Sequence, residues 1–257
     1  MRQQLLIWSL ALLMAIAPAA YAIDHKNLDE GRPLRLDDAY AIASGELAVE
    51  VGAGVALERR GPDRGVFPLE VLYGAFPNLQ LGLGTTLLTD PREVHEQTKS
   101  GDLRVSGLYN VNQETLTLPA FGLKVELNLP TGVDSAGVDV EVKGIVTRSI
   151  HRLSFHLNAG YAFVSGTTPD ERDGRYEVTL GASYPVGAPQ YTRTTLVADL
   201  FTEQGDRRGG SNVFGAEVGF RHQLTQRVVV DAGVGSELAG PADRSSLFVT
   251  TGVSVGF

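Results

Sequence analysis

Ser154, His156 and Asn158 are the side chains in this sequence that come nearest to a set for nucleophilic catalysis. In such a set a base must lie within hydrogen-bond reach of the attacking hydroxyl, about 3 Å away. The three residues alternate with apolar Phe155 and Leu157, which is the period of a β-strand, and neighbours on one strand face stand about 7 Å apart. The pattern therefore favours polar lining of one strand face over a hydrolytic site.

Ligands for metals or cofactors are equally hard to assemble from this sequence. Cysteine is absent, so thiolate ligands, thiol nucleophiles and disulfides are excluded. Calcium accepts carboxylate oxygens, and two groups supply them, although solvated charge is their commoner role: Asp37 with Asp38, and Asp134 with Asp139 and Glu141. The remaining histidines show no metal spacing: His25, His95, His151 and His222. We expect no metal, no cofactor and no catalytic residue, and hence no enzyme.

The charge balance also bears on the partners of this protein. Its 257 residues include 22 basic and 30 acidic side chains, which give a formal net charge of -8. No run of Lys and Arg interrupts this acidic balance, whereas the phosphates of nucleic acids require clustered basic residues. We therefore expect no nucleic-acid partner.

Residues 1–22 have the order of features found in a secretory signal peptide. Arg2 supplies a positive start, Leu5–Ile16 an apolar stretch, and Ala20-Tyr21-Ala22 a small-x-small cleavage site. The alternative is an N-terminal membrane anchor, but the apolar stretch is short beside the roughly 20 residues that a spanning helix needs. We expect cleavage at this site, which leaves residues 23–257 as an exported protein.

From residue 45 onward the sequence alternates apolar and polar side chains with a period of two. In 79–88, for example, leucines alternate with Gln80, Gly82 and Gly84. Such alternation is typical of strands whose two faces meet different surroundings. It predicts an all-β protein of about 12 strands, near residues 46–58, 66–75, 79–88, 102–111, 121–129, 138–146, 153–163, 175–184, 192–203, 212–222, 227–237 and 247–257. Pro68 lacks the amide donor that a central strand uses, which weakens the pattern near 66–75.

The connections between these strands alternate between short and long. The short ones are 76–78, 112–115, 151–152, 185–190 and 223–226. The longer, polar ones are 59–65, 89–101, 130–137, 166–174, 204–211 and 238–245. An even number of strands with short turns at one end and long loops at the other is typical of bacterial transmembrane barrels, which are antiparallel and up-and-down. We expect both termini and the turns in the periplasm, and the loops outside the cell.

Bulky charges and aromatic residues indicate that the polar strand face lines a lumen and the apolar face meets lipid. The polar face carries ions of both signs, and the expected lumen-lining residues are Arg104, Lys124, Glu126, His156, Arg193, Asp199, Glu217, Arg221 and Asp231. Aromatic residues on the apolar face gather near the strand ends, as in the girdles of membrane barrels. Those near the turns are Tyr73, Tyr109, Phe155, Tyr184, Phe220 and Phe257, and those near the loops are Phe67, Phe163, Tyr176 and Phe214.

Charges of opposite sign also alternate on the expected lumen face. The pairs are Lys124 beside Glu126, Asp139 and Glu141 beside Lys143, Arg193 before Asp199, and Glu217 before Arg221. Opposite charges in a confined interior attract more strongly than surface pairs, because solvent screens them less. We expect these pairs to brace the barrel of residues 45–257 and to narrow its pore. The polar residues 23–44 before the barrel form a separate segment, either periplasmic or plugging the lumen.

Short motifs spread along nearly the whole exported chain carry a family resemblance: Arg32-Pro33-Leu34 with Asp37-Asp38-Ala39, Gly45-Glu46-Leu47 with Glu50, Gly101-Asp102-Leu103, Pro119-Ala120, Leu129-Pro130-Thr131-Gly132, Asn158-Ala159-Gly160-Tyr161, and Gly256-Phe257. They resemble the outer-membrane family that takes its name from the meta-pathway of phenol degradation. The resemblance implies an outer-membrane barrel that passes aromatic or other small hydrophobic compounds. It supplies no catalytic residues.

These observations lead us to expect a passive outer-membrane channel for small solutes in a Gram-negative bacterium. Its other partners are outer-membrane lipid and the barrel-assembly machinery, whose C-terminal signal the terminal Phe257 resembles. Barrels of about 12 strands fall between small ones with filled interiors and large porins with open channels, so we expect a narrow, charge-lined pore. Two alternatives remain, namely a closed structural or adhesive barrel, and a lipid-modifying barrel enzyme.

Overall fold

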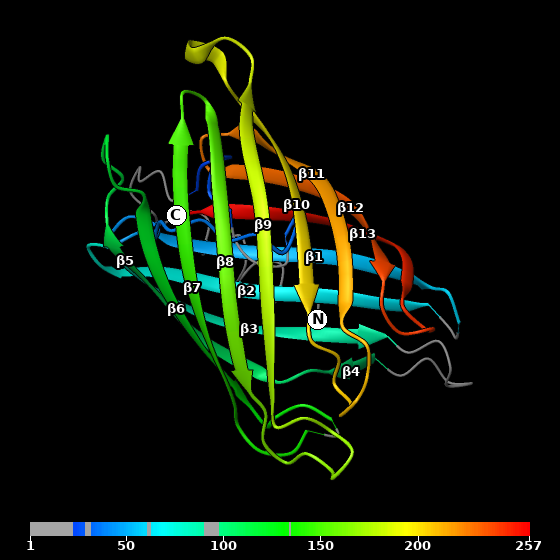
Figure 1. The fold of residues 1–257 in the computed structure, drawn as a ribbon. Helices are drawn as coiled ribbons and strands as arrows, with labels where there is room; N and C mark the ends of the chain where they lie inside the picture. Colours follow the sequence, from blue (N-terminus) through cyan, green and yellow to red (C-terminus); the bar gives the residue numbers. More distant parts are fainter. Residues whose placement is uncertain (1–22, 29–31, 61–62, 90–97, 134) are drawn as a thin grey trace, which may run out of the picture.

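The computed structural model describes residues 23–28, 32–60, 63–89, 98–133 and 135–257. Their strands form one antiparallel sheet, which closes because β1 pairs with both β13 and β2 while β2 pairs with β3. Figure 1 shows the strands wrapped around a common interior. The strands are β1 Leu47–Glu58, β2 Arg64–Phe76, β3 Leu79–Thr89, β4 Thr98–Ser100, β5 Leu103–Asn112, β6 Ala120–Leu129, β7 Asp139–Ile150, β8 Leu153–Phe163, β9 Gly174–Val186, β10 Thr194–Glu203, β11 Val213–Thr225, β12 Val228–Ala239 and β13 Ser245–Gly256.

β4 and β5 together form one stave of the barrel. Both pair with β3, β4 near its loop end and β5 near its turn end. Gly101 and Asp102 interrupt this stave, and the Gly101 amide donates to the Thr86 carbonyl at 2.7 Å. Counted in this way the described strands form 12 staves. This confirms the predicted all-β, antiparallel up-and-down barrel of about 12 strands.

Pro68 lies inside β2, where the sequence pattern was weakest. It pairs with Thr86 of β3, but the register between β1 and β2 lapses between the pairs Val51–Leu69 and Gly54–Val66. A proline has no amide hydrogen to donate across a ladder, which accounts for the interruption on one side only. Pairing with β1 and β3 continues on both sides of Pro68, so β2 remains one strand. It spans Arg64–Phe76 and is longer than the predicted 66–75.

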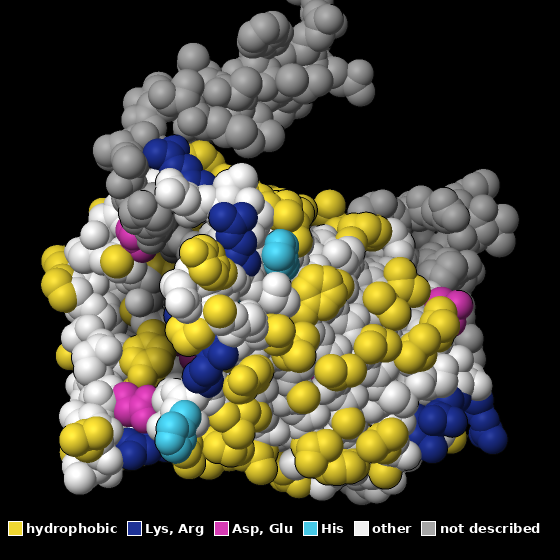
Figure 2. Space-filling view, turned by 90° about the horizontal axis from the view of Figure 1, so that it is seen from above, with side chains coloured by type: hydrophobic (Ala, Val, Ile, Leu, Met, Phe, Trp, Pro, Cys, Tyr) yellow, Lys and Arg dark blue, Asp and Glu magenta, His cyan; other side chains and the backbone are white. Residues whose placement is uncertain are grey.

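The apolar face of the strands points outward and the polar face points inward. On β3 the outward Leu81 and Leu83 are 46% and 50% exposed, while Gly82 and Gly84, which alternate with them, are buried. Figure 2 shows hydrophobic side chains spread over the outer surface of the strands. A soluble protein rarely exposes a continuous apolar surface of this kind, whereas a membrane barrel presents it to lipid.

The connections differ from the prediction at the turn end. Three turns of the described chain have two residues, namely 77–78, 151–152 and 226–227, and Asn78 and His151 adopt φ of 67° and 58°. By contrast, the turns 113–119 and 187–193 are longer than the loops 59–63 and 240–244 at the other end, and the second turn holds a short 3-10 helix, Pro189–Tyr191. Proline cannot continue a ladder, so Pro119 and Pro189 widen these turns. In the described part of the chain no helix is long and apolar enough to cross a bilayer.

Several predictions fall on residues outside the described ranges. These are the signal peptide of residues 1–22, His95, Asp134, and parts of the expected loops 59–65, 89–101 and 130–137.

The buried hydrophobic core lies inside the barrel and depends on residues 23–28 and 32–44, which we call the lumen segment. Three clusters join its side chains to the inner wall. Ile23 and Ile42 pack with Ala48, Leu72 and Val229. The other clusters are Leu28, Leu34 and Leu36 with Val197, and Ala39 with Leu108, Ala120 and Ile145.

Candidate functional site in the barrel lumen

The lumen segment forms a loop that begins and ends near the turns. At its start the amide of His25 donates to Gln223 Oε1 at 2.9 Å, close to the end of β11. Near its end the amide of Ile42 donates to Gln80 Oε1 at 3.0 Å, close to the start of β3. Between these points the Pro33 carbonyl accepts from Thr250 Oγ1 at 2.6 Å, midway along β13. The segment therefore fills the turn half of the lumen.

Side chains of the wall take the place of strand partners for the backbone of the lumen segment. Asn158 accepts from the Asp37 amide at 2.7 Å and donates to the Asp37 carbonyl at 2.9 Å. The Ala39 amide donates to Thr147 Oγ1 at 3.0 Å, and the Ala39 carbonyl accepts from Asn110 Nδ2 at 2.7 Å. Buried backbone groups cost free energy when left without partners. These contacts make the irregular segment compatible with burial.

Arg32 precedes the tip of the lumen segment and anchors the segment to β1, β12 and β13. Its guanidinium forms ion pairs with Glu50 and with Asp231, the latter at 3.3 Å, and it donates to Ser254 Oγ at 3.3 Å. The side chains of Arg32, Glu50 and Asp231 are almost fully buried. Gly52 leaves room for this approach, because a Cβ there would lie 2.5 Å from Arg32 Cδ.

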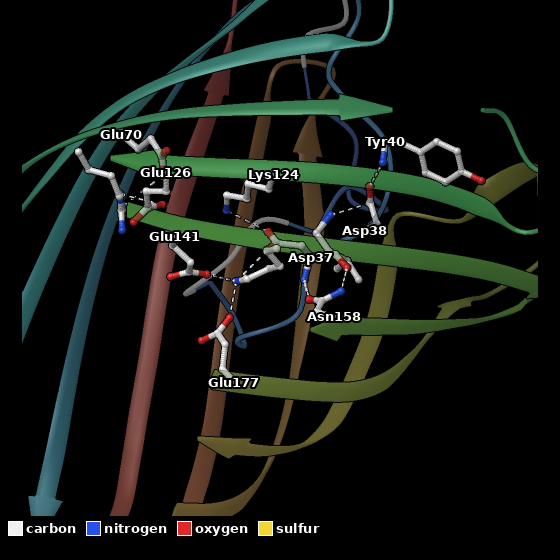
Figure 3. A network of polar contacts seen from close by, with 12 residues as sticks. Asp37, Asp38, Tyr40, Glu70, Lys124, Glu126, Glu141, Asn158 and Glu177 are labelled. Atoms are coloured by element: carbon white, nitrogen blue, oxygen red, sulfur yellow. Dashed lines mark hydrogen bonds and ion pairs between the residues drawn. The ribbon is translucent and has the colours of Figure 1, made fainter. Parts of the chain in front are cut away.

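Asp37 follows the tip of the lumen segment and anchors the segment to β6, β7 and β8, as Figure 3 shows. Its carboxylate lies 3.4 Å from Lys124 Nζ and 3.4 Å from Lys143 Nζ. Lys143 is 1% exposed and also pairs with Glu177 at 2.7 Å. Its ammonium thus links the wall and the lumen segment through one buried charge network.

The Asp38 side chain joins two parts of the lumen segment to each other through its hydrogen bonds. Its carboxylate accepts from the amides of Leu28 at 2.9 Å and Tyr40 at 2.8 Å. These bonds connect the part of the lumen segment before its tip with the part after it. Burial raises the pKa of the Asp38 carboxyl to about 7, because the backbone bonds offset only part of the loss of hydration.

Arg35 lies at the tip of the lumen segment and points toward β10, β11 and β13. Its Nε donates to Glu217 at 3.1 Å and its Nη1 to Glu203 at 2.5 Å. The guanidinium carbon stands 4.1 Å from the ring centre of Phe201 and 5.7 Å from that of Phe248. Burial alone would lower the pKa of Arg35, but the carboxylates of Glu203 and Glu217 raise it above its usual value.

Two cavities lie on the loop side of the lumen segment. The larger, of about 650 Å³, rests on Pro33, Leu34 and Arg35 and is walled by apolar and polar side chains together, among them Val66, Leu88 and Phe248. The second, of about 500 Å³, has seven acidic and four basic side chains in its lining. A third cavity of about 500 Å³ lies at the turn end, bordered by Lys26 and Tyr40. The lumen segment therefore stands between spaces open toward opposite ends of the barrel.

The predicted lumen-lining residues are not all placed alike. Five are buried on inward positions: His156, Asp199, Glu217, Arg221 and Asp231. Arg104 lies 3.6 Å from Glu70 and 3.7 Å from Glu126, and Lys124 pairs with Asp37. Arg193 differs, because it precedes β10 and is exposed at the turn end. Arg193 belongs to the long turn before β10 and not to the strand, so its side chain lies outside the lumen. The expected pairing of Arg193 with the buried Asp199 is therefore wrong.

The Ser154, His156 and Asn158 set is divided among separate partners. Ser154 Oγ bonds with Ser149, and the His156 ring bonds with Thr147 and Ser183. Asn158 holds the lumen segment, as described above. Among the described residues, no group of three or more His, Asp or Glu side chains is placed to hold a metal ion.

Apart from Phe257, which follows β13, the predicted girdle residues lie on outward strand positions. Eight are at least 40% exposed: Phe67, Tyr73, Tyr109, Phe155, Phe163, Tyr184, Phe214 and Phe220. Tyr176 is half-buried, and its hydroxyl accepts from Asn212 Nδ2 at 2.6 Å. Phe257 is half-buried beside β1, where its amide donates to the Leu47 carbonyl at 2.8 Å. Their place at the lipid–water interfaces, and the role of Phe257 in assembly, stay predictions.

The sequence predicts only some of the residues that hold the lumen segment. Arg32, Arg35, Glu50 and Glu203 are not among the residues expected in the lumen, whereas Lys124 and Lys143 are. One signal was available: Arg32, Arg35 and Asp37 place both signs of charge in a segment without alternation. Such a segment has no strand partners of its own, so its charges require counter-ions on the wall.

Comparisons with solved structures show that this fold is shared with known outer-membrane proteins. The COG4313 outer membrane channel from Pseudomonas putida F1 is 16% identical with a TM-score of 0.68, covering 90% of this chain and 100% of that one. The NanC porin is 13% identical with a TM-score of 0.61 (80% and 98% covered), and the CymD monoaromatic hydrocarbon channel is 9% identical with a TM-score of 0.50 (83% and 89% covered). No curated protein sequence matches this chain.

The sequence itself matches a family profile over residues 31–254, a range that includes the lumen segment from Arg32 onward and the barrel almost as far as the end of β13. The chain belongs to the family described as "Putative MetA-pathway of phenol degradation".

Proposed function

We propose that the protein is a passive channel for small solutes in the outer membrane of a Gram-negative bacterium. One observation carries the proposal: an apolar outer wall encloses a polar lumen whose cavities are separated by a segment attached without covalent cross-links. Ion pairs and hydrogen bonds hold this segment, and such contacts exchange with water when the segment shifts. Solute passage then follows the lumen when the segment is displaced.

The larger loop-side cavity supports a class of solute. Its volume of about 650 Å³ falls in the range of small-molecule sites, roughly 300–1,000 Å³. Apolar side chains such as Leu34, Val66 and Phe248 form much of its surface, with Glu217 and Glu237 beside them. This mixture suits a small compound with an apolar body, including an aromatic one. The family description and the printed name of CymD point to the same class.

The lumen segment also favours a second candidate, a closed structural or adhesive barrel. In that case the segment would be a permanent part of the core, and the charge network would serve stability alone. A lipid-modifying enzyme has less support, because Ser154, His156 and Asn158 have separate partners.

Liposome swelling separates these candidates. We expect liposomes that contain the purified protein to swell in isosmotic solutions of small sugars or phenol, and empty liposomes not to swell in the sugars. Swelling should fall steeply as the solute grows, because the lumen segment leaves a narrow passage. If small solutes fail to enter even when residues 23–44 are deleted, the barrel is closed and the channel proposal fails.

A further inference from the structure

We propose that the barrel wall carries a binding site for a guanidinium group, and that Arg35 occupies this site as a tethered ligand. The ligand class is a small organic cation that bears a guanidinium group. The site deepens the proposed channel function, on which it rests only for the route by which a free ligand arrives. We call the site the guanidinium cradle and define it by Phe201, Glu203, Glu217 and Phe248.

The carboxylates of the cradle match the planar fork of a guanidinium. Glu217 accepts from both the amide and the Nε of Arg35, at 2.9 and 3.1 Å, while Glu203 accepts from Nη1 at 2.5 Å. The Glu217 side chain is 2% exposed, so its carboxylate is held in place and poorly hydrated. Two N–H groups of one guanidinium thus donate to two separate carboxylates, and the fixed directions of these donors distinguish a guanidinium from an ammonium group, which acts as a point charge.

Two aromatic rings complete the cradle. Phe201 and Phe248, whose ring centres lie 6.3 Å apart, both stand within cation–π range of the Arg35 guanidinium. Each ring lies over a glycine of a neighbouring strand, Phe201 over Gly215 and Phe248 over Gly235, where a Cβ would collide with the ring. The wall is therefore shaped to hold both rings in this position.

A free cation can reach the cradle from the loop side. Arg35 and Glu203 are 35% and 34% exposed, and the two loop-side cavities border the cradle through Glu203, Glu217 and Phe248. Acidic side chains outnumber basic ones in the lining of the second cavity, which concentrates cations there. Every group of the cradle belongs to β10, β11 or β13, so the site persists when the lumen segment moves.

The tether predicts how binding changes when Arg35 is removed. A group on a short flexible linker competes at an effective concentration in the mM range, so it masks the cradle from a weak free ligand. We expect Arg35→Ala in detergent to bind ethylguanidinium at least about tenfold more tightly than the wild type by titration calorimetry. Ethylurea, a neutral ligand of nearly the same shape, should not bind. Arg35→Ala with Glu217→Gln should lose the gain, and Arg148→Ala, at the turn end, should behave as the wild type.

A second measurement does not depend on the stability of Arg35→Ala. The chain has no cysteine, so Leu34→Cys places a single thiol next to Arg35, at a position that is 3% exposed. We expect ethylguanidinium to speed the labelling of this thiol by a small maleimide, and ethylurea or sodium chloride at equal concentration to leave the rate unchanged.

Two results together would overturn the proposed guanidinium site. Arg35→Ala would bind ethylguanidinium no more tightly than the wild type, and the cation would leave the labelling rate of Leu34→Cys unchanged. Equal binding by Arg35→Ala with and without Glu217→Gln would likewise overturn it. Both readouts are made in detergent without a membrane gradient. The outcome of these binding measurements is therefore independent of the outcome of the liposome swelling, so failure of the guanidinium site and failure of the channel proposal can be told apart.

Discussion

Lys143 illustrates at the residue scale how one buried charge joins the wall to the lumen segment. Its ammonium lies 2.7 Å from Glu177 and 3.4 Å from Asp37, and the side chain is 1% exposed. Removal of one partner from a buried ion pair leaves the other charge uncompensated, at a cost of about 3–5 kcal/mol. We expect Lys143→Met to lower the free energy of unfolding by an amount of this order. Urea unfolding followed by circular dichroism checks it, with exposed Lys26→Met as the control, and equal midpoints for all three proteins would contradict it.

Asp38 carries a pH dependence whose sign follows from its burial. Its folded-state pKa of about 7 lies above the unfolded value of 3.8, so its contribution to stability is present below pH 4 and is lost as the pH rises through 7. The loss between these limits is at most about 4 kcal/mol. We expect the wild type to lose more stability than Asp38→Asn between pH 5 and pH 8. Thermal midpoints of both proteins in detergent test this, and parallel pH profiles would rule out the assignment.

At the scale of elements, the lumen segment is the part most open to a direct test. A Cβ at Gly122 of β6 would lie 3.4 Å from the Ala39 Cβ, close to the usual Cβ separation of a disulfide, about 3.8 Å. Ala39→Cys with Gly122→Cys should therefore lock the segment to the wall on oxidation. We expect oxidation to reduce solute entry into liposomes and dithiothreitol to restore it. Each single-cysteine variant serves as a control, and equal entry in both redox states would mean that solutes bypass the segment.

The elements also show what the sequence does and does not reveal. Alternation along stretches such as 79–88 predicts strands and their two faces, because lipid and lumen impose opposite preferences on neighbouring positions. It fails around Pro68, where pairing with β3 carries the strand past a missing donor. It also fails at 113–119 and 187–193, whose prolines lengthen the turns. The lumen segment has no period, and its partners come from strands far apart in the chain, so only the closed barrel brings them together.

The same limit explains which charges the sequence could pair. Arg221 and Asp231 face each other across β11 and β12, as strand register alone suggests. The ion pairs of Asp37 with Lys124 and of Arg35 with Glu203 join residues that are 87 and 168 positions apart in the sequence, and no strand register relates them. The sequence predicts charge in the lumen and a segment that could enter it, but it does not predict which charges of the two pair with each other.

At the scale of the whole molecule, the orientation in the membrane is a testable prediction. Bacterial barrels place their turns in the periplasm and their loops outside. We expect an epitope tag inserted at 207–210, between β10 and β11, to be labelled on intact cells. A tag at 226–227, in the turn between β11 and β12, should be labelled only after the outer membrane is permeabilised. The reverse pattern would invert the topology.

Single-channel recording in planar bilayers tests the central proposal most directly. The barrel encloses a lumen that the segment of residues 23–44 narrows, so we predict small, discrete conductance steps for the wild type. The variant that lacks residues 23–44 should give larger steps, because the turn half of the lumen is then open. Absence of steps from both proteins, although each is inserted and folded, would contradict the account and leave a closed barrel.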